Sequence, residues 1–360
     1  MNRWNSFLAV CGYLRAGLLG GPPPAATAPV RWDRLIEASS RHLVTPALAW
    51  CLRNEADIPP EIGDYFAAAL ALNGRRNAIL LEGLARTVAA LNAIDIEPVL
   101  LKGAARLFDQ TYPAPSLRLL GDLDVLIPRD RATAAATALK NIGFDTAADI
   151  PDEPMHYHHL PMMCERETGI GVELHTELTR PPNDRIFSAA WFEQKTRPIH
   201  FRNLRLRMGD ATRIIAHNIV HDQLHHANYR ARRCTLRQLL DLAVVRAKNE
   251  GAIDWAELDR LFCSVGQGKV IATYLEFANR LFGQAPPALS HAPRVGALAA
   301  FRVMIEHPAL RASTVLGRWS IRTIAVRCRD PRKALDLISP RAWQRRARLI
   351  KGALDQADWR

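Results

Sequence analysis

The sequence predicts an α+β fold, in which a small mixed-sheet core is flanked by N-terminal and C-terminal helical regions. Three observations predict it. Apolar residues recur with a helical period as far as about Asn92, short apolar runs typical of strands occupy residues 97–178, and the helical period returns beyond Asp210. The expected parts are an N-terminal segment with a proline-rich linker (1–30), a helical region (31–95), the α/β core (96–205), a helical domain (206–284) and a basic helical tail (285–360).

The N-terminal segment loosely resembles a signal peptide. Arg15 interrupts its apolar part and no small-x-small cleavage site follows, which argues against secretion. The run PPPAAT at 22–27 is typical of a stiff linker. Six cysteines are scattered without a CxxC pair, as in proteins of a reducing compartment, so the expected location is the cytoplasm. No run approaches the ~20 apolar residues that a membrane-spanning helix needs.

Helices are predicted between the linker and the strands. One covers WDRLIEASSRHL, and a second begins where Thr45 can cap and Pro46 fits the first turn. Ile58-Pro59-Pro60 ends that helix. From Glu61 to about Asn92 a further helix is expected. Its apolar face carries four residues, which are Leu80, Leu84, Val88 and Leu91.

The core begins with a short apolar strand at 97–101, followed by Lys102-Gly103 and a helix over AARLFDQ. A second strand is expected over 122–127. The next helix, RDRATAAATALKNIGF, ends at Gly143, because glycine suits a left-handed helix cap. Two further strands, MHYHHLPMMC and IGVELHTEL, are joined by a turn at 167–169.

The C-terminal part returns to helices and ends in a strongly basic stretch. The formal net charge of the chain is +12, and residues 311–360 hold thirteen Lys or Arg against four Asp, a net +9. Such a tail can bind nucleic acid or an anionic surface. The alternative is a solvated helix face in an arginine-rich composition, because no binding motif or aromatic interleaving accompanies the charge.

Two carboxylates stand two residues apart in SLRLLGDLDVLIPRD. Since side chains alternate across a strand, Asp122 and Asp124 share one face, while Leu123, Val125 and Ile127 face a core. Like charges this close repel unless a proton or a cation joins them. Either they form a Mg²⁺ site, or they protect a strand edge with charge.

The neighbouring residues favour the metal site. Gly121 permits close backbone approach, and Lys102-Gly103 opens a helix where a lysine and backbone N–H groups can hold phosphate. In 171-GVELHTEL-178, Glu173 and His175 face away from the core that Val172 and Leu174 enter. Three acids beside a phosphate-binding turn fit two-metal phosphoryl or nucleotidyl transfer.

These runs in combination resemble the largely uncharacterised bacterial nucleotidyltransferases of the DNA polymerase β-like superfamily, over roughly residues 30–265. That family shares an LKG, an R-x-x-[SG]-D-[IL]-D-[LV]-L-[IV] and a later V-E-[LI]-H. The matching runs in this chain are LLKGAARL, YPAPSLRLLGDLDVLIP, ALKNIGF, HYHHLP and GVELHTEL.

The resemblance implies an Mg²⁺-dependent transfer of NMP from an NTP to an unknown hydroxyl, with pyrophosphate release. Asp122, Asp124 and Glu173 would be the catalytic metal ligands, for two Mg²⁺ ions, with Mn²⁺ as the alternative. Lys102 and Gly103 would face the triphosphate. Arg118 would neutralise phosphate charge, and Gly121 would belong to the same nucleotide-binding segment.

Two departures from the superfamily pattern concern the metal and phosphate contacts. Ala104 follows Gly103 where Gly-Ser or Gly-Gly is usual, so a serine contact to phosphate is missing. The third acid, Glu173, is longer than the more common Asp.

Histidines form two groups. His156, His158 and His159 lie around one expected strand, where exposed or site-lining positions are favoured over zinc ligands.

The second group is His217, His221 and His225, one stripe of a helix. We expect His217 and His221, with His175, to line the acceptor pocket. The alternatives are a metal site of the His-Asp phosphohydrolase type, through His221-Asp222, and a half-buried stripe with Arg237 or Asp241 as hydrogen-bond partners.

Two other functions remain open. A DxD motif also binds nucleotide sugars in glycosyltransferases, but the nucleotide-binding half that should precede it is lacking. An inactive nucleotide-binding or interaction protein is the other alternative, although such a module does not need the third acid. The acceptor can be a small molecule, a peptide or protein, or an RNA end.

Overall fold

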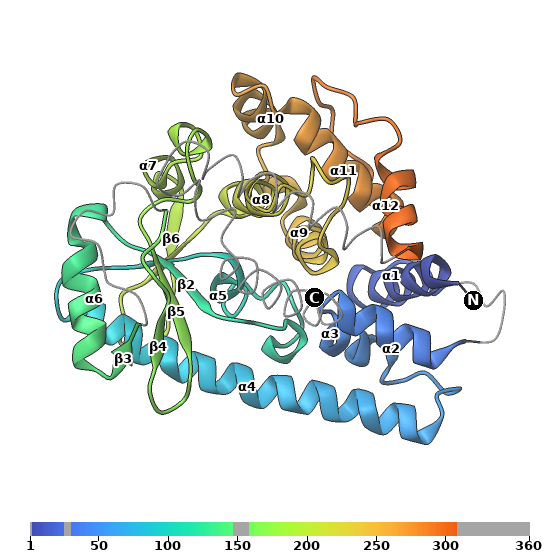
Figure 1. Cartoon of the computed structure of the whole chain (residues 1–360), viewed down its shortest axis with the longest axis horizontal. Helices are drawn as coiled ribbons and strands as arrows, with labels where there is room; N and C mark the ends of the chain where they lie inside the picture. The colour runs from blue at the N-terminus through green and yellow to red at the C-terminus, as the bar shows by residue number, and fades with distance from the viewer. Residues whose placement is uncertain (1, 25–29, 147–157, 308–360) are drawn as a thin grey trace, which may run out of the picture.

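A seven-stranded mixed sheet lies on one side of the molecule (Figure 1). The structure is a computed structural model that describes residues 2–24, 30–146 and 158–307. The strand order is β3-β4-β5-β2-β1-β7-β6. The strands are β1 (Val99–Leu100), β2 (Leu123–Leu126), β3 (Phe144–Asp145), β4 (Met163–Glu165), β5 (Gly171–His175), β6 (Thr196–Pro198) and β7 (Arg207–Gly209). The central strand β2 pairs parallel to β5 and antiparallel to β1, so the sheet is mixed as the sequence predicts.

The helices surround the sheet and fill the other side of the molecule. They are α1 (Arg3–Leu19), α2 (Trp32–Arg41), α3 (Thr45–Leu52), α4 (Pro60–Asn92), α5 (Lys102–Ala105), α6 (Ala132–Asn141), α7 (Ala189–Glu193), α8 (Ala211–Ile219), α9 (Leu236–Lys248), α10 (Trp255–Ser264), α11 (Gly268–Phe282) and α12 (Ala297–Glu306). A π-helical turn, η4 (Val220–His225), continues α8. Together the helices and the sheet confirm the predicted α+β class.

One face of the sheet is covered by α4 and α6 (Figure 1). The four predicted apolar positions of α4 are buried there against strand residues such as Val125 and Val172. Their spacing of three or four residues keeps them on a single stripe of the helix, which is why the period in the sequence identified them. This face is therefore an apolar core.

The N-terminal helices pack against the C-terminal ones, although they are far apart in the sequence (Figure 1). Phe7 of α1 lies 5.6 Å, ring centroid to ring centroid, from Phe301 of α12. Both belong to one large apolar cluster with α3, α8, α9, α10 and α11. No helix was predicted before Pro22, yet α1 buries Phe7, Val10 and Leu14 completely.

Several elements are shorter or less regular than the sequence predicts. The helix expected over AARLFDQ reduces to the single turn α5, and in the described part of the strand expected over MHYHHLPMMC, residues 158–164, the regular strand is β4. The helix expected through the histidine stripe changes to the π-helical turn η4. Residues 25–27 of the proline-rich run, His156 and residues 308–360 of the basic tail lie outside the described residues.

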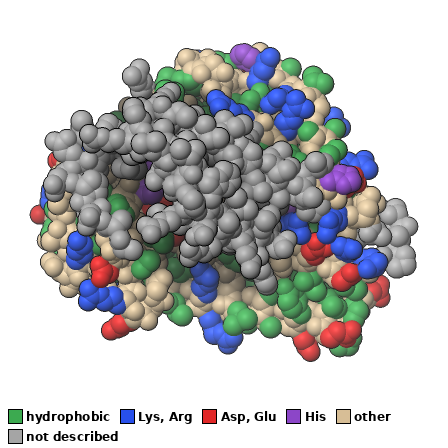
Figure 2. Space-filling view, viewed as in Figure 1, with side chains coloured by type: hydrophobic (Ala, Val, Ile, Leu, Met, Phe, Trp, Pro, Cys, Tyr) green, Lys and Arg blue, Asp and Glu red, His purple; other side chains and the backbone are tan. Residues whose placement is uncertain are grey.

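Charges of both signs are interspersed on the face drawn in Figure 2, outside the grey atoms. Hydrophobic side chains gather near the lower right of that view, over α4 (Figure 2), a helix on which Tyr65, Leu72 and Ile79 are exposed. None of the helices among the described residues combines the length and the apolar character that crossing a bilayer requires.

Candidate functional site

Two of the acids meet where β2 and β5 run side by side. Asp124 and Glu173 are direct neighbours in the parallel register, and both project from the face opposite the α4–α6 core. Leu123 and Val125 point into that core, because alternation sends every second residue to the other side. The pleat of the two strands therefore fixes both carboxylates in one place.

The Lys102 ammonium lies between these carboxylates. Its Nζ is 2.5 Å from Asp124 Oδ1, 3.7 Å from Glu173 Oε2 and 3.4 Å from His175 Nε2. His175 Nε2 is itself 2.8 Å from Asp124 Oδ1 and 3.4 Å from Glu173 Oε2. The four side chains thus form one compact polar cluster. The His175 side chain is fully buried within it.

The charges of the cluster shift its titration. Burial alone raises the pKa of Asp124, but the Lys102 charge and the hydrogen bond from His175 outweigh it and hold that pKa far below its usual value. For Glu173, burial acts in the same way and is again outweighed, first by His175 and then by Lys102. Burial lowers the pKa of Lys102, yet the Asp124 charge leaves it raised. All three groups are therefore charged near neutral pH.

Asp122 lies at the edge of the cluster, just before β2. Its pKa is raised, first by burial and then by the neighbouring charge of Asp124. Among the described residues, three side chains offer metal-ligand atoms within 4.8 Å of one another, and they are Asp124, Glu173 and His175. The structure thus places Asp122 beside this group, while His175, expected in the acceptor pocket, lies inside it.

The turn at Lys102 aims the lysine at the acids. Lys102 adopts a φ of 44°, which is unusual for a residue with a Cβ, and Leu101 N donates to Asp124 O at 3.0 Å just before it. Gly103 is buried, and a Cβ there would lie 2.5 Å from Leu120 Cδ2. The glycine thus allows α5 to pack closely on Leu120. By contrast, a Cβ at Gly121 would meet no atom within 4 Å, which leaves room beside the backbone.

Arg118 has a different partner from the one the sequence predicts. Its buried guanidinium donates to both oxygens of Asp241, through Nε at 3.0 Å and Nη2 at 2.8 Å. Tyr112 Oη donates to Asp241 Oδ1 at 2.8 Å. The guanidinium is engaged in an internal ion pair, and the expected role in neutralising phosphate stays a prediction. The pair ties the segment before β2 to α9.

Seven histidine rings form a continuous group, which reaches the acids through His175. Neighbouring ring centroids lie 4.3 to 6.2 Å apart. The members are His158, His159, His175, His217, His221, His225 and His226. The turn η4 supplies two of them and ends just before His226, and π-helical turns of this kind often occur at functional sites. The stripe and the strand histidines, separate in the sequence, thus share one site.

Burial keeps several of these histidines uncharged. The pKa of His217 and of His225 is lowered to about 3 and that of His226 to about 4, first by burial and then by neighbouring positive charge, which comes from Lys102 for His217 and His226 and from His226 and Arg180 for His225. These imidazoles are therefore neutral at physiological pH. Neutral imidazoles can both donate and accept hydrogen bonds.

The hydrogen-bond partner of the stripe differs from both expected residues. Gln238 Nε2 and His221 Nδ1 lie 3.4 Å apart, whereas Arg237 donates to Leu119 O and Asp241 binds Arg118. The sequence singled out the wrong positions of α9, because Arg237 and Asp241 turn toward the segment before β2.

Asp222 takes no part in the histidine group. Its carboxylate is fully buried and accepts from Asn228 Nδ2 at 2.8 Å and from Gln223 Nε2 at 2.7 Å. The backbone N–H of Thr235 adds a weaker contact at 3.3 Å. The adjacent His221 and Asp222 thus point to different surroundings, which does not fit a His-Asp metal site.

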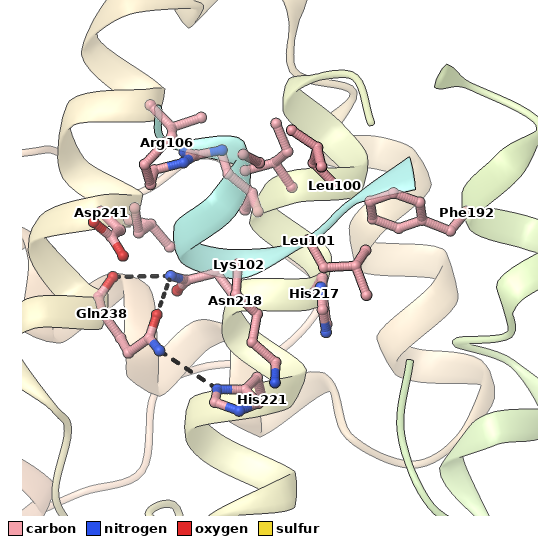
Figure 3. Close-up of a pocket in the computed structure, with 15 residues that line it drawn as sticks. Leu100, Leu101, Lys102, Arg106, Phe192, His217, Asn218, His221, Gln238 and Asp241 are labelled. Atoms are coloured by element: carbon pink, nitrogen blue, oxygen red, sulfur yellow. Dashed lines mark hydrogen bonds between the residues drawn. The ribbon is translucent and has the colours of Figure 1, made fainter. Parts of the chain in front are cut away.

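A narrow pocket extends from Lys102 between α5, α8 and α9 (Figure 3). His217, Asn218 and His221 line it, and Asn218 Nδ2 donates to Gln238 Oε1 at 3.1 Å. Two buried nitrogens of Arg106 and the Nε2 of His217 have no hydrogen-bond partner among the described residues. The pocket therefore offers polar groups to a bound molecule. Of its residues, Asn218, Gln238 and Arg106 lacked any distinguishing motif in the sequence.

One of three comparisons with known proteins gives a match. A family model described as "Uncharacterised nucleotidyltransferase" matches residues 28–283. The search of curated proteins found no match, and neither did the search of solved structures. The match spans the sheet, the acids, Lys102 and the histidine stripe.

Proposed function

Since the chain belongs to this family of uncharacterised nucleotidyltransferases, we propose that it moves an NMP from an NTP to a hydroxyl acceptor and releases pyrophosphate. One observation carries the proposal. Asp124 and Glu173, from neighbouring strands, lie in register beside an ammonium group, on the polar face of an otherwise apolar sheet. Such paired carboxylates suit divalent cations that bind a triphosphate.

The donor groups fit a divalent metal. Two carboxylates and an imidazole converge, and their charge is balanced by an ammonium rather than by a permanent structural partner such as an arginine fork. We propose that Asp124 and Glu173 hold the metal, with Asp122 reaching it from the edge of the cluster. When bound, Mg²⁺ or Mn²⁺ would stabilise negative charge on the phosphate oxygens and favour the acceptor oxygen as nucleophile.

The protein groups supply binding and orientation. The Lys102 side chain can turn from the carboxylates to the triphosphate, where its charge offsets that of the phosphate oxygens. Open space beside Gly121 gives the nucleotide access to the strand end. Holding donor and acceptor in line contributes much of the rate in reactions of this kind.

The histidine group is the proposed acceptor side of the site. His217 and His221 line the pocket that begins at Lys102, and His175 connects the pocket region to the acids. Since His217 and His221 are neutral, they can hold a hydroxyl or amide by hydrogen bonds without attracting a second phosphate. We therefore propose a polar, uncharged acceptor group, carried by a small molecule, a peptide or an RNA end.

Pyrophosphate release from each of the four NTPs, with Mg²⁺ or Mn²⁺ and a cell extract as the source of acceptor, tests the proposal. Asp124→Asn is expected to lower the rate by at least about a hundredfold, since metal stabilisation contributes several kcal/mol. Asp145→Asn is the matched control, because Asp145 is exposed and its ion pair with Arg166 lies at the surface. Its rate should equal that of the wild type.

Two outcomes would contradict the proposal. One is release of a nucleoside diphosphate from a nucleotide sugar, which indicates a glycosyltransferase. The other is tight NTP binding with no turnover in any extract, which indicates an inactive binding protein.

A further inference from the structure

The position of Lys102 shows where the cluster favours positive charge. Its Nζ contacts an oxygen of Asp124 and lies within 3.7 Å of Glu173 Oε2 and 3.4 Å of His175 Nε2. The same three residues each offer one ligand atom, and these ligand atoms lie within 4.8 Å of one another as a candidate metal group. The ammonium thus occupies the space that a metal ion held by these atoms would take.

The position of His175 directs its Nε2 at the space that the Lys102 ammonium occupies. The side chain has no exposed surface, and its Nε2 is fixed 2.8 Å from Asp124 Oδ1. The other nitrogen, Nδ1, has no hydrogen-bond partner among the described residues. Without a metal, Nε2 donates its proton to Asp124; a metal would bind the other tautomer, in which the proton lies on Nδ1 and the Nε2 lone pair faces the ion.

An imidazole ligand changes which metal is preferred. Mg²⁺ favours oxygen ligands in a near-octahedral arrangement and gives up its water reluctantly. First-row transition ions accept imidazole readily, and two carboxylates with one imidazole suit Mn²⁺ or Fe²⁺. The ion must also displace the Lys102 ammonium from between the acids, which favours an ion that binds the set more strongly.

We propose that His175 is a direct metal ligand and that the site selects a first-row transition ion, such as Mn²⁺, over Mg²⁺. This inference rests on the proposed metal-dependent transfer, and it assigns His175 a place in the metal site in addition to the acceptor pocket. Lys102 holds that place until the ion enters, and its displaced ammonium then becomes available to the nucleotide.

Electron paramagnetic resonance of Mn²⁺ added to the metal-free, full-length protein tests the inference. Pulsed measurements detect the coupling of bound Mn²⁺ to an imidazole nitrogen, and titration with Mg²⁺ gives the ratio of the two affinities. The wild type should show nitrogen coupling and bind Mn²⁺ at least about tenfold more tightly than Mg²⁺. In His175→Gln, which offers an oxygen in place of Nε2, the coupling should vanish and the ratio should fall toward one.

The control is His159→Gln. The His159 ring lies 5.2 Å from that of His175, but its Nδ1 donates to Leu160 O at 2.6 Å. This variant should keep both the coupling and the metal preference. If the His175 variant fails to fold, the wild-type coupling decides alone.

Bound Mn²⁺ without nitrogen coupling would overturn the inference, as would coupling that persists in His175→Gln. Neither result tests the proposed function, which is measured separately as NTP-dependent pyrophosphate release. Conversely, nitrogen-coupled Mn²⁺ without any transfer would contradict the function and leave the metal assignment standing.

Discussion

At the scale of single residues, the centre of the site is an ammonium between two carboxylates. Lys102 neutralises Asp124 and Glu173, which would otherwise repel each other at neighbouring positions of a parallel strand pair. The lysine is thus both a structural counter-charge and a competitor for any cation that enters. These two roles predict opposite effects of its removal on metal binding and on turnover.

Lys102→Met should therefore tighten metal binding and slow transfer. Without the ammonium the carboxylates keep their full negative charge for the ion, while the triphosphate loses a positive partner. Both quantities are measured on the same preparation. The affinity for Mn²⁺ is expected to rise by about tenfold, and kcat is expected to fall by about tenfold. Lys140→Met, on the surface of α6, is the control. Loss of Mn²⁺ binding in Lys102→Met would show that the lysine supports the site instead of competing for it.

Arg118 and Asp241 form the second residue-scale prediction. Because both side chains are buried, Arg118→Met leaves an uncompensated carboxylate and should cost about 3–5 kcal/mol in the free energy of unfolding. Urea denaturation measures this cost. The double variant Arg118→Met with Asp241→Leu should recover much of it. A stable Arg118→Met protein with weakened NTP binding would instead restore the phosphate role expected from the sequence.

At the scale of elements, the packing of the short helix α5 determines the position of a residue of the proposed site. Its first residue is Lys102, and its second, Gly103, lies against Leu120 with no room for a Cβ. The position of the lysine thus depends on how closely α5 approaches the segment before β2.

Gly103→Ala should shift α5 and cost about 1–3 kcal/mol of stability, as overpacking typically does. Transfer activity should fall with it, because Lys102 moves. Since the contact is with the end of a leucine side chain, Leu120→Ala should restore stability in the double variant. A double-mutant cycle on urea unfolding and on pyrophosphate release measures both effects. Simple additivity of the two substitutions would refute the packing explanation.

How much of these elements the sequence could predict depends on the range of the interactions. The alternation in GDLDVLIP and GVELHTEL was enough to place Asp124 and Glu173 on the polar face, because a strand's pleat is local. The pairing of Arg118 with Asp241 joins residues 123 positions apart. A local pattern carries no information on such a contact. The turn η4 escaped prediction for a related reason, since its histidines have ordinary helical spacing and only the packing reveals the irregular turn.

At the scale of the whole molecule, α1–α3, α8–α11 and α12 share one apolar cluster, while the sheet and its covering helices form another. The histidine group lies where the two meet: His175 comes from the sheet, and His217 and His221 come from the helical side. Period changes in the sequence located the sheet and the later helices. They did not show that α1 completes the helical cluster, because its apolar residues surround the helix without a clear stripe.

The buried histidines should make the protein sensitive to mild acid. Below pH about 6.5 the unfolded chain binds protons that the folded chain, with a pKa of about 3 at His217, does not bind. The free energy of unfolding is therefore retained above that pH and falls as pH decreases toward 3. For His217 alone the loss between about pH 7.5 and about pH 5.5 is about 1.4 kcal/mol.

Urea unfolding at these two pH values measures the effect. His217→Asn should reduce the difference in unfolding free energy between the two pH values by the contribution of one histidine. His307→Asn, at an exposed position, should leave that difference as in the wild type. Equal stability of the wild type at both pH values would show that the histidines are not held neutral.

The most direct test of the central claim, that Asp124 and Glu173 serve nucleotidyl transfer, follows the fate of the phosphate label. The wild type, Asp124→Asn and Glu173→Gln are incubated in parallel with a cell extract and an NTP labelled at either the α- or the γ-phosphate. The account predicts a product that carries the α-label and lacks the γ-label, formed by the wild type and lost in both variants. A product that carries the γ-label, or an α-labelled product that both variants still form, would contradict it.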